Sequence, residues 1–515
     1  MRAARRLPHV HETVVHMLAA AAERSPQGEA LVCDEERLTY EQYLRCVAGF
    51  SHELAGLGAR GKFVAVICGN SNDMAIAMFG IHAAGAIAVP INPVYSAREL
   101  AFLLADCRPM AVICDSGMAA RVEPLAREQG IAHLIRIGGG EGRRLTAWRD
   151  DAGARLPAEL PGREDIASLQ YTGGTTGSPK GAIIRHGPLS INISQREALL
   201  PTRPGNETVL CVMPLFHVFA SAMCLHLTAY CRGRMVILRR YHPDLVFDAL
   251  EQEKVTRLPA GPTVFIGLMS HPRMATTDFS SLACAYSGSA PLPGETLKQW
   301  QQATGAPILE GYGQSEAGPV LTYIAEGGRI VPGSVGEVVP QTEVQIVDVD
   351  SGTRVLGPGE RGEIRARGPQ VMAGYYNRPE ETAAALRGGW LYTGDIGEFD
   401  EDGYLYIRDR KKDMAIVGGY NVYPREIDEV LYGHPDVLEA AAVGVPDAYR
   451  GEVIRAYVVA RPGCRLEARD VADHCAANLA RYKLPAAIEI VTELPKTTVG
   501  KIDKKALRAQ AGRGA

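Results

Sequence analysis

Apolar residues along the first 115 positions alternate between helical spacing and short continuous runs. Three runs, residues 63–68, 86–91 and 110–115, are almost wholly apolar and are predicted to be buried strands. Helices are predicted before and between these strands, and two of them begin with capping-box patterns, at Thr39 and Ser96. Strand, helix and strand in succession favour a parallel sheet that helices cover on both faces.

Further along the chain the pattern changes twice. Residues 338–367 are rich in Val, Ile, Gly and Glu, and patches of period-two alternation such as 342–347 predict a smaller, mostly antiparallel β unit. From about Asp413 the pattern predicts helix, strand, strand, helix, strand and helix, which is typical of a compact α+β domain. The expected fold class is therefore α/β, with a large N-terminal domain and a small C-terminal one.

Two uncharged runs, residues 74–97 and 208–231, are each long enough to span a bilayer. The first contains Pro90 and Pro93, and the second contains histidines as well as a proline. Because polar groups are costly in lipid, we interpret both runs as buried core and expect no membrane span.

Composition narrows the class of protein further. The chain has 515 residues, which predicts two or more domains, and a net charge of −4 without a dense Lys/Arg run, so no nucleic-acid partner is expected. Its eleven cysteines form no C-x-x-C pair, which disfavours a disulfide framework or a zinc site. The basic N-terminus lacks the apolar stretch of a signal peptide, and a cytoplasmic location is predicted.

The most informative segment is residues 171–181, YTGGTTGSPKG. Its glycines allow the backbone to approach an anion closely, while the hydroxyls of Thr172, Thr175 and Thr176 and the cation of Lys180 can surround phosphate oxygens. The alternative is a flexible linker, which the Pro-Lys step disfavours. The spacing differs from that of the Walker phosphate loop.

This loop resembles the signature of the adenylate-forming superfamily, which contains acyl-CoA synthetases, adenylation domains of peptide synthetases and firefly luciferase. Further motifs follow in the family's order along essentially the whole chain: PLFH at 214–217, SGSAPL at 287–292, GYGQSE at 311–316, YTGD at 392–395, RDRKKD at 408–413, GGYNVYP at 418–424 and PKTTVGK at 495–501. The resemblance implies an N-terminal domain of residues 1–411 that holds the acid and ATP pockets. It also implies a mobile C-terminal domain of residues 412–515.

The resemblance also implies roles for the polar residues of the phosphate site. The three threonines and Lys180 would hold the β- and γ-phosphates of ATP, and Ser315 would contact the α-phosphate. Most relatives carry Thr at this last position. Glu316 would hold Mg²⁺, a hard cation that prefers oxygen ligands.

On the nucleoside side, the resemblance implies that the ring of Tyr312 lies against adenine, with Ser289 and Ala290 on its other side. Asp395 would accept both ribose hydroxyls, and Arg410 would reach the ribose as well.

The resemblance places the catalytic lysine at Lys501 and the hinge between the two domains at Lys412. In one orientation of the C-terminal domain, Lys501 would bridge the carboxylate and the α-phosphate. In the other, the loop around Gly418 and Gly419 would form the channel for the coenzyme A thiol.

The sequence does not specify which carboxylic acid the protein would activate. Val218 stands where amino-acid-activating relatives have an aspartate, so an α-amino acid is not expected. His217 could gate between the acid pocket and the thiol channel, or be a core histidine. The predicted pocket is roomy and apolar, suited to a fatty, aryl or bulky alicyclic acid, and consists of His217, Val218, Phe219, Gly261, Gly288, Gly313 and Val320.

The resemblance therefore implies an ATP-dependent acyl-CoA synthetase that forms acyl-AMP, releases pyrophosphate and transfers the acyl group to coenzyme A. Its ligands would be a small carboxylic acid, ATP, coenzyme A and Mg²⁺, and it would be a monomer or homodimer. One alternative is an acyl-AMP ligase that loads an acyl carrier protein. Another is a non-catalytic relative that only binds ligands.

Overall fold

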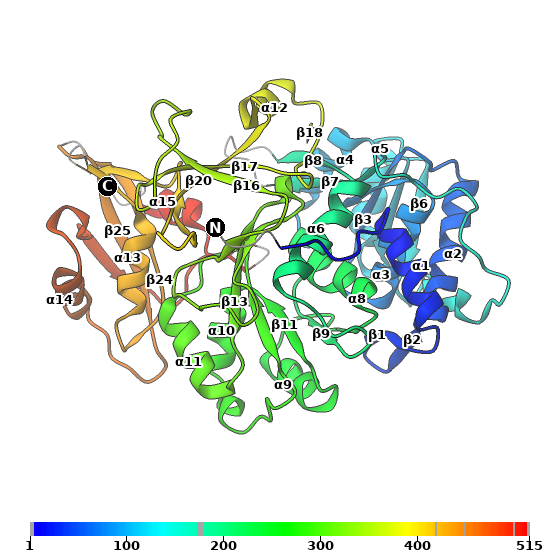
Figure 1. The fold of residues 1–515 in the computed structure, drawn as a ribbon, viewed down its shortest axis with the longest axis horizontal. Coiled ribbons are helices and arrows are strands. Elements are labelled where there is room, and N and C mark those ends of the chain that lie inside the picture. Colours follow the sequence, from blue (N-terminus) through cyan, green and yellow to red (C-terminus); the bar gives the residue numbers. More distant parts are fainter. Residues whose placement is uncertain (1–4, 173–178, 418–419, 448, 498–499, 512–515) are drawn as a thin grey trace.

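The computed structural model describes residues 5–172, 179–417, 420–447, 449–497 and 500–511. Two large sheets form its N-terminal part, and a smaller lobe contains the C-terminal residues (Figure 1). The first sheet has nine strands in the order β15 (Glu337–Val338), β14 (Val320–Tyr323), β13 (Ile308–Gly313), β12 (Cys284–Ser287), β11 (Arg257–Ala260), β9 (Thr208–Cys211), β10 (Arg234–Ile237), β1 (Glu29–Cys33) and β2 (Glu36–Thr39). Neighbours from β13 to β1 are parallel, and the strands added at either edge are antiparallel.

The second sheet has seven strands and contains the three strands predicted from apolar runs, here β3, β4 and β5. Its order is β18 (Gly374–Tyr375), β8 (Lys180–Arg185), β7 (Ile166–Thr172), β4 (Ile87–Pro90), β3 (Phe63–Ile67), β5 (Ala111–Asp115) and β6 (His133–Ile137). The strands from β7 to β6 are parallel, as predicted.

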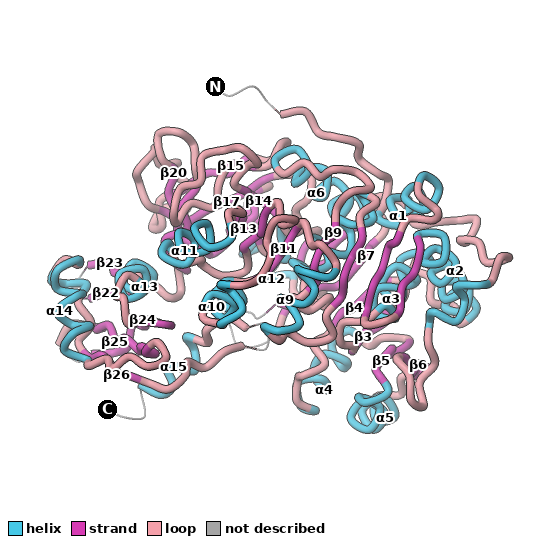
Figure 2. The backbone as a smooth tube through the Cα atoms, turned by 90° about the horizontal axis from the view of Figure 1, so that it is seen from below, coloured by secondary structure: helices cyan, strands magenta, loops and turns pink. Residues whose placement is uncertain are grey.

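Alternate residues of β3 belong to two different apolar clusters, so both faces of this sheet are covered. Val64 and Val66 pack with α2 (Tyr40–Gly56) and α3 (Asn72–Ala83), whereas Ala65 and Ile67 pack with α4 (Ala97–Cys107) and α5 (Ala119–Glu128) (Figure 2). The first of these clusters also includes α1 (Val14–Arg24) and α6 (His186–Leu199) and continues into the nine-stranded sheet. Both capping boxes are present, at the starts of α2 and α4.

The two uncharged runs are mainly buried core, as predicted, although residues 93–97 at the end of the first run are partly or fully exposed. All residues of α3 are buried, which explains a helix without a polar face. The second run forms β9, the short helix α7 (Val218–Ala220), a π-helical turn (Ser221–His226) and α8 (Leu227–Cys231). Among the described residues, no helix has the length and apolar character needed to cross a membrane.

The nine-stranded sheet is covered by α9 (Pro243–Gln252), α10 (Pro262–Met269) and α11 (Gly294–Thr304), whose apolar faces join the same core. A separate antiparallel unit follows, as predicted. It consists of β16 (Glu343–Val347), β17 (Gly362–Arg367), β19 (Leu386–Arg387), β20 (Trp390–Phe399) and β21 (Leu405–Arg410), with α12 (Pro379–Ala385) beside it.

The C-terminal lobe has its own sheet with an apolar cluster on each face. Its elements are β22 (Ala415–Val417), β23 (Tyr420–Val422), α13 (Pro424–Tyr432), β24 (Val437–Asp447), β25 (Gly451–Ala460), α14 (Ala468–Asn478), β26 (Ala487–Ile490) and α15 (Lys504–Ala511). One cluster contains α13 and α14, and the other contains α15. The predicted order is confirmed from α13 onward, but the hairpin β22–β23 was not predicted because its strands are only three residues long.

Candidate active site

The predicted phosphate loop starts at the end of β7 and finishes at the start of β8, and these two strands pair antiparallel. Thr172 at the end of β7 lies opposite Lys180 at the start of β8. The Lys180 ammonium lies 5.4 Å from the centre of the Tyr375 ring. Thr175 and Thr176 fall outside the described residues, so their predicted contacts with phosphate stay predictions.

Glu316 lies beside this hairpin and is almost fully buried. Its Oε1 accepts hydrogen bonds from the Tyr375 hydroxyl at 2.9 Å and from the Thr172 hydroxyl at 3.3 Å. Ser315 precedes it at the start of a short 3-10 turn that follows β13. The structure thus brings Thr172, Lys180 and Glu316 together, and it adds Tyr375. Tyr375 lies 59 residues from Glu316 in the chain, and no sequence motif pointed to it.

Three residues predicted to bind the nucleoside form a second cluster. The Tyr312 hydroxyl donates to Asp395 Oδ2 at 2.6 Å, and Arg410 Nε lies 3.3 Å from Asp395 Oδ1. Asp395 and Arg410 are direct neighbours across the β20–β21 pair. Burial raises the pKa of Asp395, and the Arg410 guanidinium opposes that shift. Asp395 therefore presents a nearly buried carboxylate next to one fixed cation.

Ser289 and Ala290 follow β12, the parallel neighbour of the strand that carries Tyr312. The carboxyl ends of parallel strands meet at one sheet edge, which places these residues on the same side as Tyr312. Ser289 has a positive φ of 71°, a conformation that turns the chain sharply after the strand.

Lys501 reaches this site from the C-terminal lobe. Burial and the nearby Arg410 lower the pKa of Lys501 to about 8, and Asp395 opposes the shift. The preceding Gly500 lies against α10, because a Cβ added there would be 3.3 Å from the Thr263 hydroxyl. The loop that holds Lys501 is therefore seated on the N-terminal part of the molecule.

Several contacts fasten the C-terminal lobe in this position. Arg425 of α13 donates through Nη1 to the Ile407 carbonyl at 2.6 Å, and its N–H donates to Asp409 Oδ2 at 3.1 Å. Arg361 of the antiparallel unit forms an ion pair with Glu426 of α13. The observed orientation is the one in which Lys501 faces the nucleotide-side residues.

His217 borders both Lys501 and the predicted acid pocket. Its Nδ1 accepts a hydrogen bond from the Phe219 N–H at 3.2 Å, which fixes the start of α7. Burial, followed by the positive charge of Lys501, lowers the pKa of His217 to about 3. The imidazole is therefore neutral at physiological pH, and Val218 after it is buried.

The glycines of the predicted pocket differ in what surrounds them. A Cβ added at Gly288 would lie 2.9 Å from the edge of the Phe219 ring, so this glycine makes room for that side chain. A Cβ at Gly261 would meet only Met213, at 3.7 Å. Gly288 and Gly261 thus border side chains that can move.

At Gly313, glycine is required by the close approach of another backbone segment. An added Cβ would lie 1.7 Å from the Pro319 carbonyl oxygen, which is backbone of the adjoining segment. A larger side chain at Gly313 would therefore meet backbone first, before it could narrow the predicted acid pocket. Val320, next in the chain, is buried, and its N–H donates to Asn192 Oδ1 at 2.9 Å.

The predicted hinge residue Lys412 is exposed and lies in the turn between β21 and β22. The N–H groups on either side of it are held, from Lys411 to the Gly394 carbonyl at 2.9 Å and from Asp413 to the Arg410 carbonyl at 2.8 Å. Gly418 and Gly419, predicted to form the thiol channel, lie outside the described residues.

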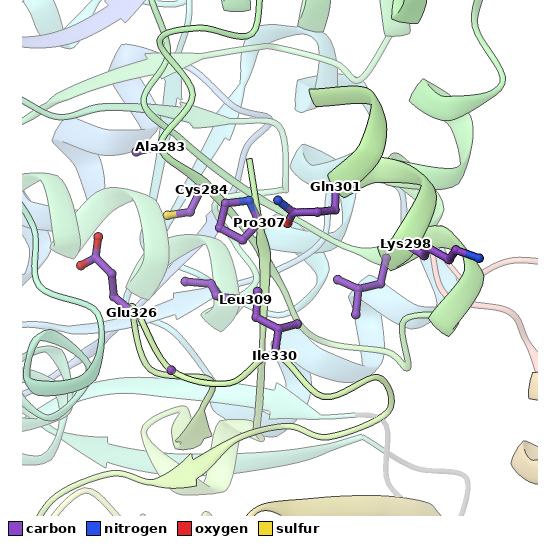
Figure 3. A pocket seen from close by; sticks show the side chains of 11 residues that line it. Ala283, Cys284, Lys298, Gln301, Pro307, Leu309, Glu326 and Ile330 are labelled. Carbon is purple, nitrogen blue, oxygen red and sulfur yellow. The ribbon is translucent and has the colours of Figure 1, made fainter. Parts of the chain in front are cut away.

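A pocket of about 480 Å³ lies elsewhere, beside α11 and the strands β12 and β13 (Figure 3). It is open and mostly apolar, with Lys298 and Glu326 among its lining residues. As far as the structure describes the chain, its lining contains none of the predicted site residues. It is distinct from the site around Lys501.

Comparison with known families gives two matches along the chain. The model described as AMP-binding enzyme matches residues 18–376, and the model described as AMP-binding enzyme C-terminal domain matches residues 426–501. Together they span both the N-terminal sheets and the C-terminal lobe.

Three characterised or solved proteins are similar over nearly their full length. A long-chain-fatty-acid–CoA ligase of Bacillus subtilis (strain 168) is 36% identical over 532 aligned residues, covering 97% of this chain and 95% of the relative. A feruloyl-CoA synthase of Amycolatopsis sp. is 37% identical over 497 residues, covering 95% and 97%. The solved structure of the anthranilate CoA ligase AuaEII in complex with anthranoyl-AMP has a TM-score of 0.91 at 30% identity, covering 98% of each chain.

Proposed function

This chain belongs to the AMP-binding enzyme family of adenylate-forming enzymes, and from that premise we propose that it activates an apolar carboxylic acid as acyl-AMP and passes the acyl group to coenzyme A. It is an acid–thiol ligase of the AMP-forming type, with ATP and coenzyme A as co-substrates. The observation that best supports the catalytic assignment is the position of Lys501 beside Asp395, Arg410 and His217.

The proposed reaction has two displacement steps. A carboxylate oxygen attacks the α-phosphorus of ATP, the bond to pyrophosphate breaks, and acyl-AMP forms. The coenzyme A sulfur, after losing its proton, then attacks the acyl carbon, and AMP leaves. Because negative oxygens must approach one another in the first step, preorganised cations and hydrogen-bond donors are what the protein must supply.

Lys501 is the proposed source of positive charge between the carboxylate and the α-phosphate. A lysine ammonium is a compact cation on a flexible stem, suited to bridging two anionic groups. The neutral imidazole of His217 next to it adds no charge of its own. Ser315 is the proposed contact of the α-phosphate.

The ribose cluster and the β12–β13 edge would bind the nucleoside. Asp395 would accept hydrogen bonds from the ribose hydroxyls, with Arg410 beside it, and the Tyr312 ring would lie against adenine. Ser289 and Ala290, on the neighbouring strand end, would line the other side of the base.

The phosphate hairpin would hold the β- and γ-phosphates through Lys180, Thr172 and the threonines of its turn. Glu316 fits the proposed Mg²⁺, since Mg²⁺ is commonly held by one or two carboxylates together with substrate phosphates. Within the described residues there is no cluster of three or more His, Cys, Asp or Glu that could hold a metal by itself. When bound, Mg²⁺ would offset the charge of the phosphates that this hairpin positions.

The acid is proposed to be fatty, aryl or bulky alicyclic rather than an α-amino acid. The relatives named above act on a long-chain fatty acid, ferulate and anthranilate according to their names. Val218 offers no charge to an ammonium group, and burying an unpaired ammonium is costly.

The second step is proposed to require rotation of residues 412–515 about Lys412, relative to residues 1–411. The rotation would withdraw Lys501 and bring Gly418 and Gly419 to the thiol. We further propose that the protein is a monomer or homodimer and that it acts in the cytoplasm on ATP and coenzyme A.

The proposed function is tested with a panel of fatty, aryl, alicyclic and α-amino acids. Each acid is assayed first for exchange of pyrophosphate into ATP and then for consumption of coenzyme A. We expect AMP, pyrophosphate and an acyl-CoA from apolar acids. Release of ADP would contradict the mechanism, and acyl-AMP that loads a carrier protein but ignores coenzyme A would contradict the proposed acceptor.

A further inference from the structure

Three buried histidines meet in the core beneath the acid site. His82 of α3, His186 of α6 and His226 at the end of the π-helical turn are each at most 2% exposed. The rings of His82 and His186 are 5.2 Å apart, and the ring of His226 lies 5.8 Å from that of Phe79.

These histidines have ring nitrogens that the protein does not satisfy. Among the described residues, no hydrogen-bond partner is within reach of His82 Nδ1 or of either nitrogen of His186 or His226. Leaving a buried polar atom unpaired is costly, and such atoms in folded proteins are normally paired. The unsatisfied nitrogens of His82 and His226 are therefore available to a further hydrogen-bonding group.

Two of these histidines, His82 and His226, line a small cavity. It has a volume of about 10 Å³, on the order of what one water-sized group needs. Polar side chains make up half of its lining, namely His82, His226, Ser168, Gln170 and Ser221. His186 packs against His82 but does not line the cavity.

The cavity adjoins the candidate active site on two sides. Val218, the neighbour of His217, lines it, and so does Gly318, which directly follows the turn that holds Ser315 and Glu316. From His217 to His226 the helical segment advances roughly 13 Å at 1.5 Å per residue. Its second half is the π-helical turn, a rare geometry that is frequent at functional sites.

We propose that the acid site continues past Val218 into this cavity and selects carboxylic acids that carry a hydroxyl group at the end remote from the carboxylate. The inference rests on the proposed function, because it assigns the substrate class of the same site. His226 and His82 hydrogen-bond the hydroxyl, while the carboxylate lies near Lys501.

The chemistry of the cavity favours a neutral hydroxyl over a charged group. Burial lowers the pKa of His226 to about 3 and that of His82 well below its usual range, so both rings are neutral. A neutral imidazole has one donor and one acceptor nitrogen, which matches a hydroxyl that both donates and accepts. An ammonium or a second carboxylate would find no opposite charge there.

The test compares matched acids that differ by one hydroxyl: 4-hydroxycinnamic with cinnamic acid, and an ω-hydroxy fatty acid with the unsubstituted acid of the same length. The quantity measured is the ratio of kcat/KM values for AMP release within each pair. We expect at least one pair to favour the hydroxylated acid by about tenfold or more, since a site built to bind a hydroxyl discriminates against its absence. If only the cinnamic pair shows this preference, the substrate is an aryl acid, and if only the fatty-acid pair shows it, the substrate is an alkyl acid.

Substitutions of the three histidines then show which side chains cause the preference for the hydroxylated acid. His226→Phe and His82→Phe keep a ring of similar size and remove the hydrogen bonds, so the ratio should fall toward one. His186→Phe is the matched control, equally buried in the same cluster but outside the lining, and should keep the wild-type ratio. Testing both lining histidines guards against one variant failing to fold.

A wild-type ratio near one in both pairs would overturn the inference, as would an unchanged ratio in the folded variants. Either result would mean that the histidines serve a resident water only. Failure of the proposed function looks different, because then no acid of either kind would release AMP.

Discussion

At the residue scale, Lys501 illustrates how the surroundings set the chemistry of a side chain. An isolated lysine keeps its positive charge up to a pH near its ordinary pKa of 10.5. Here burial and Arg410 lower the pKa of Lys501 to about 8, with Asp395 only partly compensating. The positive charge that we propose to act between two anions is therefore present at neutral pH but would be lost at mildly alkaline pH in the free enzyme.

This pKa predicts an alkaline limit for the first half-reaction. A lysine is cationic below its pKa, so kcat/KM for adenylation should fall as the pH rises through about 8. Lys501→Arg keeps its charge far above that pH, so the variant should be slower but lose the alkaline limb. The measurement is the pH profile of pyrophosphate exchange. An identical limb in the arginine variant would assign the titration to another group.

Removing the cation should separate the two half-reactions. Lys501→Ala should lose about 10²–10³ in adenylation rate, the effect of deleting one preorganised electrostatic contact. It should still convert supplied acyl-AMP to acyl-CoA, because Lys501 would have left the site by then. Single-turnover kinetics of each half-reaction measure both. Equal losses in the two halves would indicate a role in folding or shared binding.

At the scale of elements, β13 and the segment that leads into β14 approach so closely that a side chain at Gly313 has no room. Gly288, at the end of the adjacent strand β12, faces the Phe219 ring instead. Two glycines that look alike in the sequence therefore have different tasks, one in backbone packing and one beside a movable side chain.

This difference predicts that substitution by alanine affects stability at Gly313 and substrate range at Gly288. Gly313→Ala should destabilise the protein by about 1–3 kcal/mol or more, because backbone must shift to admit the methyl group. Gly288→Ala should fold normally and lose activity toward the bulkiest acids first, as the Phe219 ring is displaced into the pocket. Thermal unfolding and an acid panel measure the two effects. A stable Gly313→Ala, or an unchanged acid range in Gly288→Ala, would contradict this account.

At the scale of the whole molecule, the C-terminal lobe is held in one orientation by contacts that cross to the N-terminal part. Arg361–Glu426 and Arg425 with the Ile407 carbonyl are examples. These contacts are polar, as is common at interfaces between domains of one chain. The single connection between the two parts runs through the exposed turn at Lys412.

Stiffening that turn should impair only the second half-reaction. Lys412→Pro fixes φ and restricts Lys411 before it, so the rotation proposed for thioester formation should be hindered. Adenylation should be retained if the observed orientation is kept. Lys412→Ala, which leaves the backbone free, is the control and should resemble the wild type. Loss of adenylation in the proline variant equal to its loss of thioester formation would contradict the hinge assignment.

The sequence by itself determined the local elements and named the candidate site residues. Capping boxes at α2 and α4, the buried strands β3 to β5 and the order of motifs are encoded by neighbouring residues, so they could be predicted without the fold. The short hairpin β22–β23 escaped because three-residue strands have too few residues to show a periodicity.

Tertiary structure alone decided which distant groups meet. Tyr375 contacts Glu316, and Lys501 lies near Asp395 and His217, although each pair is separated by dozens to hundreds of residues. The histidine cluster joins side chains from three helical segments, each of which looks like ordinary core in the sequence. Hydrophobic periodicity specifies that such positions are buried. What they are buried against depends on how sheets and helices pack. The same packing sets the pKa of Lys501, the need for glycine at position 313 and the proposed polar end of the acid site.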